Sequence, residues 1–476
     1  MFSGLILARW KLEKETIIMA EKAKKMEEKR SVKLSSKEKI LLLFAVAIST
    51  ALFFYLASSE INNWIKAPLI IAELAGSGML IAKIGRFDNY YGIIVLKGKG
   101  GFGTMRYFAK NHPRAARELA DFGLSLSFGI PYSYYLFRKD ANFWKFPVHT
   151  VLVTLFFIAI NGLTVQDYEG TEGIFLAINL ALGLVGLGGA FLFTHGLKIL
   201  TVEGTPAGVM PVVPGVTIPW EGIIAIIIAA TVHEVSHGIL AMVEKLKVKS
   251  SGVILFGIVP IGAFVDPDEE EFKKIAIHKR RRILVAGSTA NFFAFLIFGL
   301  LTAGVAIYAS SLIGGTEVFS VMNTSSAYGV LHEKETIMAI NGIAIGRTAD
   351  VAKAMQGKKE GEIVKIRTQS GESDVTLSKG GKLGVLLQEF PKPGSETAYG
   401  ISIFILVVFG LTVIINFALA TVNMLPLFLT DGYRVVYEEL TDMFPSGKNE
   451  FAKKASIAIG LVIVALLLLN LFPNFR

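Results

Sequence analysis

Long apolar stretches constrain this chain more than any other feature of its sequence. Several runs of about 18 or more residues are almost free of charge, which is enough to cross ~30 Å of hydrocarbon as α-helix. Of the 476 residues, 52% are hydrophobic, and a water-soluble domain could not bury so much apolar surface. The sequence therefore predicts an all-α polytopic membrane bundle.

The number of membrane spans depends on one short segment that Pro131 interrupts. The candidate spans lie at about 40–58, 67–84, 121–137, 147–165, 173–199, 221–243, 283–309, 399–422 and 454–472. The segment 121–137 is either a span or a re-entrant stretch. We expect about nine transmembrane helices with this segment counted, and eight without it.

Positive charge sets the expected orientation, because cytoplasmic loops are enriched in Lys and Arg. Lys245, Lys247 and Lys249 follow the sixth stretch, and the basic run 279–282 precedes the seventh. The loop between them is therefore expected in the cytoplasm. Nine spans then agree with a cytoplasmic N-terminus and eight do not, although the basic residues within 138–145 would face outward. We expect a multi-pass protein of the plasma membrane.

Charge and cysteine content narrow the class of partner and of metal site. The net charge of +9 is gathered at the N-terminus and beside the apolar stretches, which indicates lipid headgroups and not nucleic acid. The chain has no cysteine, which excludes disulfides and thiolate metal sites. A tight metal site must therefore use His, Asp or Glu.

The sixth apolar stretch carries the segment HEVSH. His233 and His237 are four residues apart, so on a helix they lie on one face and can hold one zinc ion. Glu234 is placed to hold and deprotonate a water molecule that zinc acidifies. Ionisable groups inside a membrane helix are costly and usually functional, so a chance match is the weaker explanation here.

A third zinc ligand is expected from the segment NMLPLFLTDG, residues 423–432. Asp431 is the candidate, because Pro426 prevents regular helix and Asp431–Gly432 is typical of a turn that could return a carboxylate to the metal. An ordinary helix end at the membrane surface is the alternative. The expected topology puts Asp431 and His233 at similar depth, toward the cytoplasmic ends of their spans.

Together these segments resemble the site-2 protease family of intramembrane metalloproteases, over roughly residues 200–440. HEVSHG is similar to the zinc helix of that family, and NMLPLFLTDG to its second signature. AGSTAN, residues 286–291, resembles the small-residue motif on the intervening helix, and residues 261–271 resemble the membrane-associated hairpin that follows the zinc helix.

The resemblance implies that His233, His237 and Asp431 bind zinc and that Glu234 acts as general base and then acid. It also implies that Asn423 and Pro426 lie near the substrate backbone. The reaction implied is hydrolysis of transmembrane segments of other membrane proteins, after a first cut has trimmed the outer domain.

Two smaller interpretations concern substrate contacts and helix packing. An extended substrate could add as a strand to a hairpin around 253–264, although a plain amphipathic loop is the alternative. For Gly287 and Asn291 we favour a helix-packing role, because small residues let membrane helices approach and Asn can bond across an interface.

Residues 313–395 differ from the rest of the chain and resemble a PDZ domain. The run ETIMAINGIAI indicates a strand, an Asn-Gly turn and a second strand. A short helix is expected near 348–355, and Gly371 is expected at the turn of a hairpin. Such an inserted α+β domain binds peptide C-termini by strand addition, or it acts as a filter against bulky outer domains. The sequence does not separate these roles.

The expected organisation is a charged cytoplasmic tail (1–39), N-terminal transmembrane helices (40–200), a first half of the protease core (201–312), the PDZ-like domain (313–395) and a second half of the core (396–476). Two rival functions remain open. One is a catalytically silent scaffold that bears the PDZ-like domain, and the other is a metal-binding transporter, for which a base between the histidines has no use.

Overall fold

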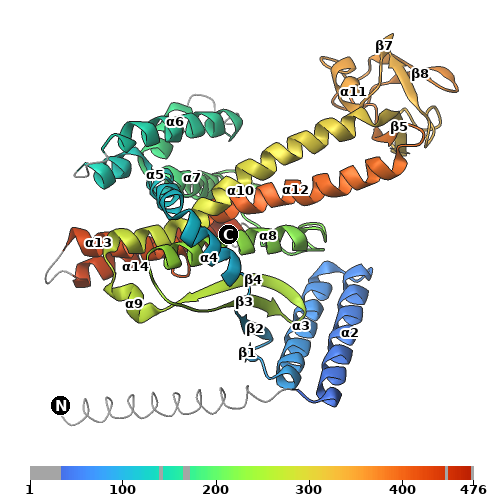
Figure 1. The fold of residues 1–476 in the computed structure, drawn as a ribbon. Coiled ribbons are helices and arrows are strands. Elements are labelled where there is room, and N and C mark those ends of the chain that lie inside the picture. The colour runs from blue at the N-terminus through green and yellow to red at the C-terminus, as the bar shows by residue number, and fades with distance from the viewer. Residues whose placement is uncertain (1–33, 139–142, 165–171, 445–448, 473–476) are drawn as a thin grey trace. The chain divides into compact units, whose positions relative to one another are not determined.

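The computed structural model describes residues 34–138, 143–164, 172–444 and 449–472 (Figure 1). Most of the expected tail, residues 1–33, lies outside this part of the chain. The helices are α2 (Ser36–Ser58), α3 (Asn63–Gly85), α4 (Phe102–Asn111), α5 (Pro113–Phe137), α6 (Lys145–Thr164), α7 (Glu172–Thr201), α8 (Gly222–Val243), α9 (Glu269–Lys274), α10 (Ile277–Ser311), α11 (Thr348–Ala354), α12 (Glu396–Val422), α13 (Asp431–Met443) and α14 (Asn449–Leu471). The strands are β1 (Asp88–Tyr90), β2 (Ile93–Gly98), β3 (Val248–Phe256), β4 (Val259–Pro267), β5 (Ile313–Val321), β6 (Ile337–Ile340), β7 (Ile343–Ala344), β8 (Ile363–Thr368), β9 (Gly371–Thr376) and β10 (Val385–Pro391).

Seven helices are long and apolar enough to cross a membrane, counted over the described ranges. They are α2, α3 from Pro68, α7, α8, α10, α12 and α14. The expectation of a multi-pass membrane bundle is thereby supported. The other two expected spans coincide with α5 and α6. In α5 the backbone leaves helical geometry at Gly129 (φ 82°), close to Pro131, and the apolar part of α6 is shorter. The count of nine stays a prediction.

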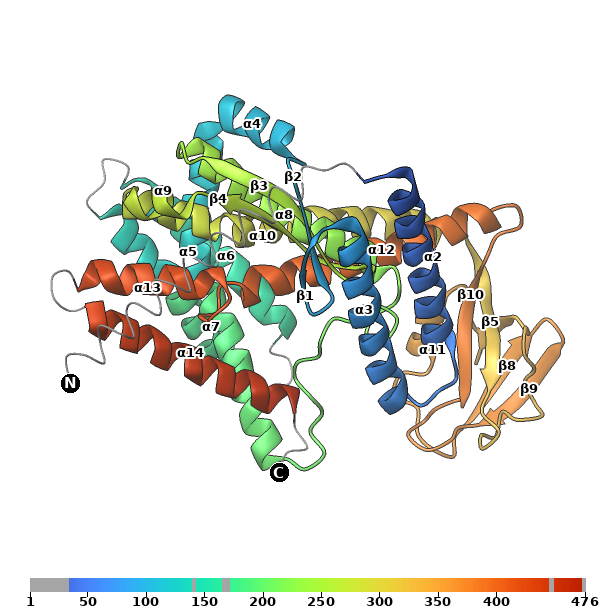
Figure 2. The same cartoon turned by 90° about the horizontal axis from the view of Figure 1, so that it is seen from below.

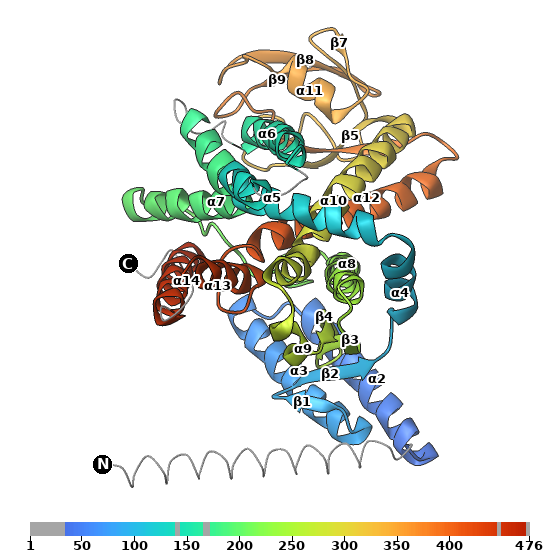
Figure 3. The same ribbon diagram turned by 60° about the vertical axis from the view of Figure 1, so that its left-hand side comes forward.

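The chain divides into two compact units, and the first comprises residues up to 294 together with those from 415 onward. Its core joins α5, α8, α10 and α13 through buried side chains that include Leu124, Leu240, Val285 and Val435. Within this unit α13 and α14 lie side by side (Figure 3). The helices that carry the candidate site residues therefore share one packed core.

A four-stranded antiparallel sheet, in the order β1-β2-β3-β4, belongs to the same unit (Figure 2). The hairpin of β3 and β4 pairs Val253 with Ala263, and it includes the region around 253–264 where we expected one. The strands β1 and β2 were not expected. They have three and six residues, which is too short for a clear alternating pattern, and β2 joins the sheet by pairing with the distant β3. The first unit is thus not purely helical.

The second unit comprises residues 295–414 and contains the segment expected to resemble a PDZ domain. Its sheets have the orders β10-β5 and β7-β6-β8-β9. Asn341 and Gly342 have positive φ angles of 49° and 82° and join β6 to β7 as the expected hairpin turn. The helix α11 and the β8–β9 hairpin also occur where we expected them. The PDZ resemblance and the domain boundaries stay predictions.

Candidate metal centre

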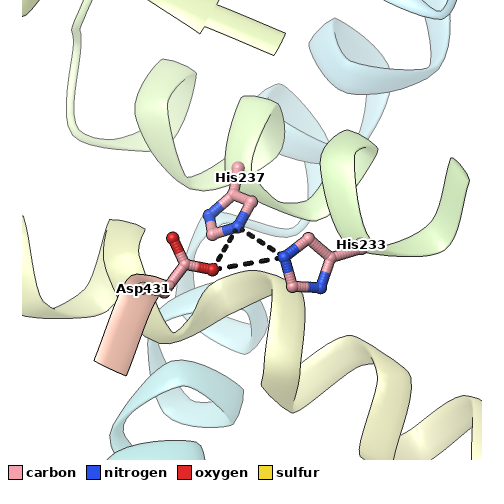
Figure 4. Close-up of side chains that lie close together, drawn as sticks. All are labelled: His233, His237 and Asp431. Atoms are coloured by element: carbon pink, nitrogen blue, oxygen red, sulfur yellow. Dashed lines mark hydrogen bonds and ion pairs between the residues drawn. The ribbon is translucent and has the colours of Figure 1, made fainter. Parts of the chain in front are cut away.

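One helix supplies two imidazoles that face the same point. In α8, His233 and His237 lie one turn apart, with ring centroids 4.8 Å apart and Nε2 atoms 3.1 Å apart. The side chain of His233 is buried. The helical spacing thus brings both Nε2 atoms together, as Figure 4 shows.

A carboxylate from a distant part of the chain completes the cluster. Oδ2 of Asp431 lies 3.2 Å from Nε2 of His233 and 3.1 Å from Nε2 of His237 (Figure 4). Within the described part of the chain, these three residues form the one group of His, Asp and Glu side chains close enough to hold a metal ion.

Local structure explains how Asp431 reaches the histidines. We expected a turn at Asp431–Gly432, but both residues lie in the first turn of α13. Thr430 is the N-cap, and its hydroxyl accepts a hydrogen bond from the backbone N–H of Tyr433. A Cβ atom at Gly432 would lie 2.1 Å from the carbonyl oxygen of Met424. The lack of a side chain at Gly432 therefore lets the first turn of α13 pack against the backbone at Met424, just after α12.

Two hydrogen bonds orient the imidazole rings. Nδ1 of His233 donates to Oδ1 of Asn291 at 2.6 Å, and Nδ1 of His237 donates to the carbonyl oxygen of Ile283 at 2.7 Å. The amide nitrogen of Asn291 donates to the carbonyl oxygen of Ala229, which fixes Oδ1 toward His233. With a proton on each Nδ1, both Nε2 atoms carry lone pairs.

The donor set fits a metal ion. Three electron-rich atoms converge at 3.1–3.2 Å from one another, and without a cation between them their lone pairs would repel. A tetrahedral zinc ion with bonds of ~2.0–2.1 Å separates its ligand atoms by about 3.3 Å. Burial raises the pKa of the Asp431 carboxyl, but the facing His237 and His233 outweigh it and hold that pKa below its ordinary value, which suits an ionised ligand.

Glu234 lies next to His233 in sequence but is held by a different element. Its Oε2 atom accepts a hydrogen bond of 2.9 Å from the backbone N–H of Val265 in β4. The side chain is half-buried. This contact brings the outer edge of the sheet against the residue expected to act as base.

Comparison with known proteins identifies the family of this chain. Residues 221–467 match Peptidase family M50, a match that covers the HEVSH segment and Asp431. The chain belongs to peptidase family M50. The resemblance to the site-2 protease family, drawn from HEVSHG and NMLPLFLTDG, is thereby confirmed.

The chain is also similar to an uncharacterised protein of Methanocaldococcus jannaschii. The two are 34% identical over 254 residues, which is 52% of this chain and 65% of that protein. The match thus spans less than two thirds of the relative, and the relative has no stated function to compare.

The resemblance to the site-2 protease family implied substrate contacts for Asn423 and Pro426. The surroundings of these two residues differ from each other. The amide nitrogen of Asn423 lies 3.2 Å from Nε2 of His233, so Asn423 reaches the edge of the cluster. Pro426 is buried, and its carbonyl oxygen lies near Gly460 of α14. A role for either residue in substrate binding stays a prediction.

Gly287 and Asn291 lie against the histidine pair, which goes beyond the packing role that we favoured. A Cβ atom at Gly287 would lie 2.5 Å from the Nε2 atoms of both His233 and His237. Asn291 fixes the ring of His233 and also donates to Oδ1 of Asn416 at 2.7 Å. The AGSTAN motif was the available signal, but its residue types fit ordinary helix contacts equally well.

Proposed function

We propose that this chain is an intramembrane zinc endopeptidase of the site-2 type, which cleaves transmembrane segments of other membrane proteins. The convergence of His233, His237 and Asp431 within 4.8 Å is the observation that carries the proposal. Membership of peptidase family M50 and seven apolar helices support it.

The proposed roles divide between the metal and the protein. Zinc, when bound by His233, His237 and Asp431, would acidify water and polarise a peptide carbonyl. Glu234 takes a proton from the attacking water and returns it to the leaving amine. Asn291 and the Ile283 carbonyl keep both rings in the tautomer that metal binding requires.

The open edge of β4 is the proposed docking site for an extended substrate. A peptide bond inside a helix is hydrogen-bonded and shielded, so the substrate must unwind before attack. In the described sheet β4 has a neighbour on one side, and the N–H of Val265 points to Glu234. A strand added to this edge would carry a peptide bond toward the base.

We also retain the sequence-based proposals for partners and location. The protein would lie in the plasma membrane with its N-terminus in the cytoplasm. The PDZ-like domain would either bind peptide C-termini or exclude substrates with bulky outer domains.

A Glu234→Gln variant tests the proposed chemistry. Gln retains an oxygen that can accept from the Val265 N–H, but it cannot take up a proton. Purified variant and wild-type protein are compared for cleavage of a helical membrane substrate and for zinc content. We expect cleavage to fall by at least ~100-fold while zinc stays bound. Undiminished cleavage would contradict the role of Glu234 as base, and absence of cleavage by wild type across varied substrates would favour the scaffold or the transporter.

A further inference from the structure

A basic cavity opens where α8 ends, apart from the residues of the metal centre. Its volume is about 600 Å³, and its apolar wall includes Phe102, Leu246 and Val248, which are all buried. Four cationic side chains line the same cavity. They are Arg106 and Lys110 of α4, and Lys245 and Lys247 just beyond α8.

Charge in this cavity is strongly unbalanced. Among the described residues that line it, Glu271 is the one carboxylate, and an oxygen of that carboxylate already accepts from the backbone N–H of Lys247 at 3.0 Å. Across the described ranges, none of the four cationic side chains forms an ion pair, and all four residues are exposed. A compact anion would therefore meet four cations with little competition.

Lys245 occupies a backbone position that ordinarily favours glycine. Its φ angle is 66°, in the left-handed region that L-residues rarely adopt. The N–H of Lys245 bonds to the carbonyl of Met242, and that of Leu246 to the carbonyl of Ala241, which is the Schellman pattern with Lys245 at its glycine site. A strained residue with an unpaired charge points to a use for its side chain.

Two other basic residues also have positive φ angles. Lys334 (φ 62°) is held by a hydrogen bond from its backbone N–H to the carbonyl oxygen of Val318, and Arg86 has a side-chain partner. Arg86, at the end of α3, has a φ angle of 56°, and its guanidinium lies 2.6 Å from Glu38. Lys245 has no comparable carboxylate among the described residues, and its ammonium group belongs to the cavity instead.

The place of the cavity in the fold identifies the source of the anion. The span α8 ends at Val243, so Lys245 and Lys247 lie where the chain leaves the apolar layer. The amphipathic helix α4 packs against α8 (Figure 3). It buries Phe102 and Met105, and it presents Arg106 and Lys110 one turn apart. Basic pockets beside membrane helices at this depth suit phosphate headgroups, whose acyl chains remain in the apolar layer.

We propose that this cavity binds the phosphate headgroup of an anionic phospholipid, which contacts α4 and the end of the helix that carries His233 and His237. The Phe102, Leu246 and Val248 wall receives the glycerol and upper acyl segments. The ligand is a structural lipid of the bilayer and takes no part in peptide hydrolysis.

Lipid retention by the full-length protein tests this assignment. The protein is reconstituted in vesicles of equal phosphatidylglycerol and phosphatidylcholine, extracted in mild detergent, and analysed by native mass spectrometry. We expect wild type to retain phosphatidylglycerol preferentially. Each cavity charge contributes about 1 kcal/mol, so Lys245→Gly should lower that retention about fivefold, and Arg106→Gln should do the same.

Lys245→Gly separates lipid binding from folding. Glycine suits the left-handed position, so the thermal unfolding temperature without lipid should equal or exceed that of wild type while phosphatidylglycerol retention falls. Lys37→Gln, which removes an exposed lysine in the first turn of α2, is the matched control and should retain lipid as wild type does. Unchanged retention in both cavity variants would overturn the proposal. So would displacement of the lipid by excess inorganic phosphate, because the site would then be one for free phosphate.

Discussion

At the scale of single residues, the histidine pair leaves no room for a side chain at position 287. The nearest imidazole atoms lie 2.5 Å from where a Cβ would stand. Gly287→Ala should therefore push the rings apart and remove zinc binding, at a cost in stability of only about 1–3 kcal/mol. Zinc content of the purified variant gives the readout. Gly299→Ala is the control, since a Cβ there would have no atom of the described part of the chain within 4 Å. Zinc content equal to wild type in Gly287→Ala would refute this account of the glycine.

Asn291 orients His233, so its loss should weaken the metal site without removing a ligand. We expect Asn291→Ala to reduce zinc affinity by about 10–100-fold, measured by competition with a chelator. Ser288→Ala on the same helix removes a buried hydroxyl that has no hydrogen-bond partner among the described residues, and its zinc affinity should match wild type. Equal affinities in the two variants would show that Asn291 only packs.

The sequence identified the candidate ligands better than their supports. Two histidines four apart and a distant Asp-Gly have few uses inside apolar helices, so His233, His237 and Asp431 could be named in advance. Gly287 and Asn291 could not, because glycine and asparagine both serve ordinary helix packing. Only the distances to His233 distinguish the two roles.

At the scale of elements, α13 is a helix at the metal centre that the sequence did not predict. Pro426 and the Asp-Gly pair suggested a turn, whereas the Thr430 N-cap starts a helix at Asp431. Tertiary contacts then stabilise that helix. Glu439 pairs with Arg281 of α10 and accepts a hydrogen bond from Tyr132 of α5. Both partners are distant from Glu439 in the sequence, so the local sequence does not reveal these contacts.

The buried carboxyl of Glu439 makes the stability of α13 depend on pH. Burial raises the pKa of Glu439 from 4.5 to about 7, although the facing Arg281 lowers that pKa. The stability that a raised carboxyl pKa confers is complete below the unfolded value of 4.5 and is lost as the pH rises through about 7. Thermal unfolding measured between about pH 5 and pH 8 tests this. As the pH rises, the free energy of unfolding of wild type should fall relative to that of Glu439→Gln, by about 1.4 kcal/mol per pKa unit. Glu450 is exposed, so Glu450→Gln is the control and its stability should change with pH as that of wild type does. A difference between wild type and Glu439→Gln that stays constant with pH would contradict the raised pKa of Glu439.

The edge of β4 makes a further prediction about substrate docking. Peptide groups alternate along a strand, so the N–H of Ala263 points to the same edge as that of Val265. Ala263→Pro removes this donor, and proline is tolerated at an edge. We expect kcat/KM for a membrane substrate to fall about tenfold with zinc content unchanged. Ala263→Ser keeps the N–H and serves as control. Equal kcat/KM for both variants would exclude strand addition at this position.

At the scale of the whole molecule, apolar stretches predicted a membrane protein because few other folds tolerate them. They predicted helix ends less well. The seventh stretch was expected to begin at 283, yet α10 begins at Ile277, because Arg280, Arg281 and Arg282 pair with Glu438, Glu439 and Asp121. Charges that seemed to belong to a loop are thereby accommodated within a helix.

The central claim is that one zinc ion, held by two histidines of α8 and the first residue of α13, drives peptide hydrolysis. Zinc content and substrate cleavage measured on the same samples of wild type and Asp431→Ala test it most directly. We predict about one zinc per chain and cleavage in wild type, with both lost in the variant. An Asp431→Ala protein that keeps its zinc and cleaves at the wild-type rate would contradict the claim.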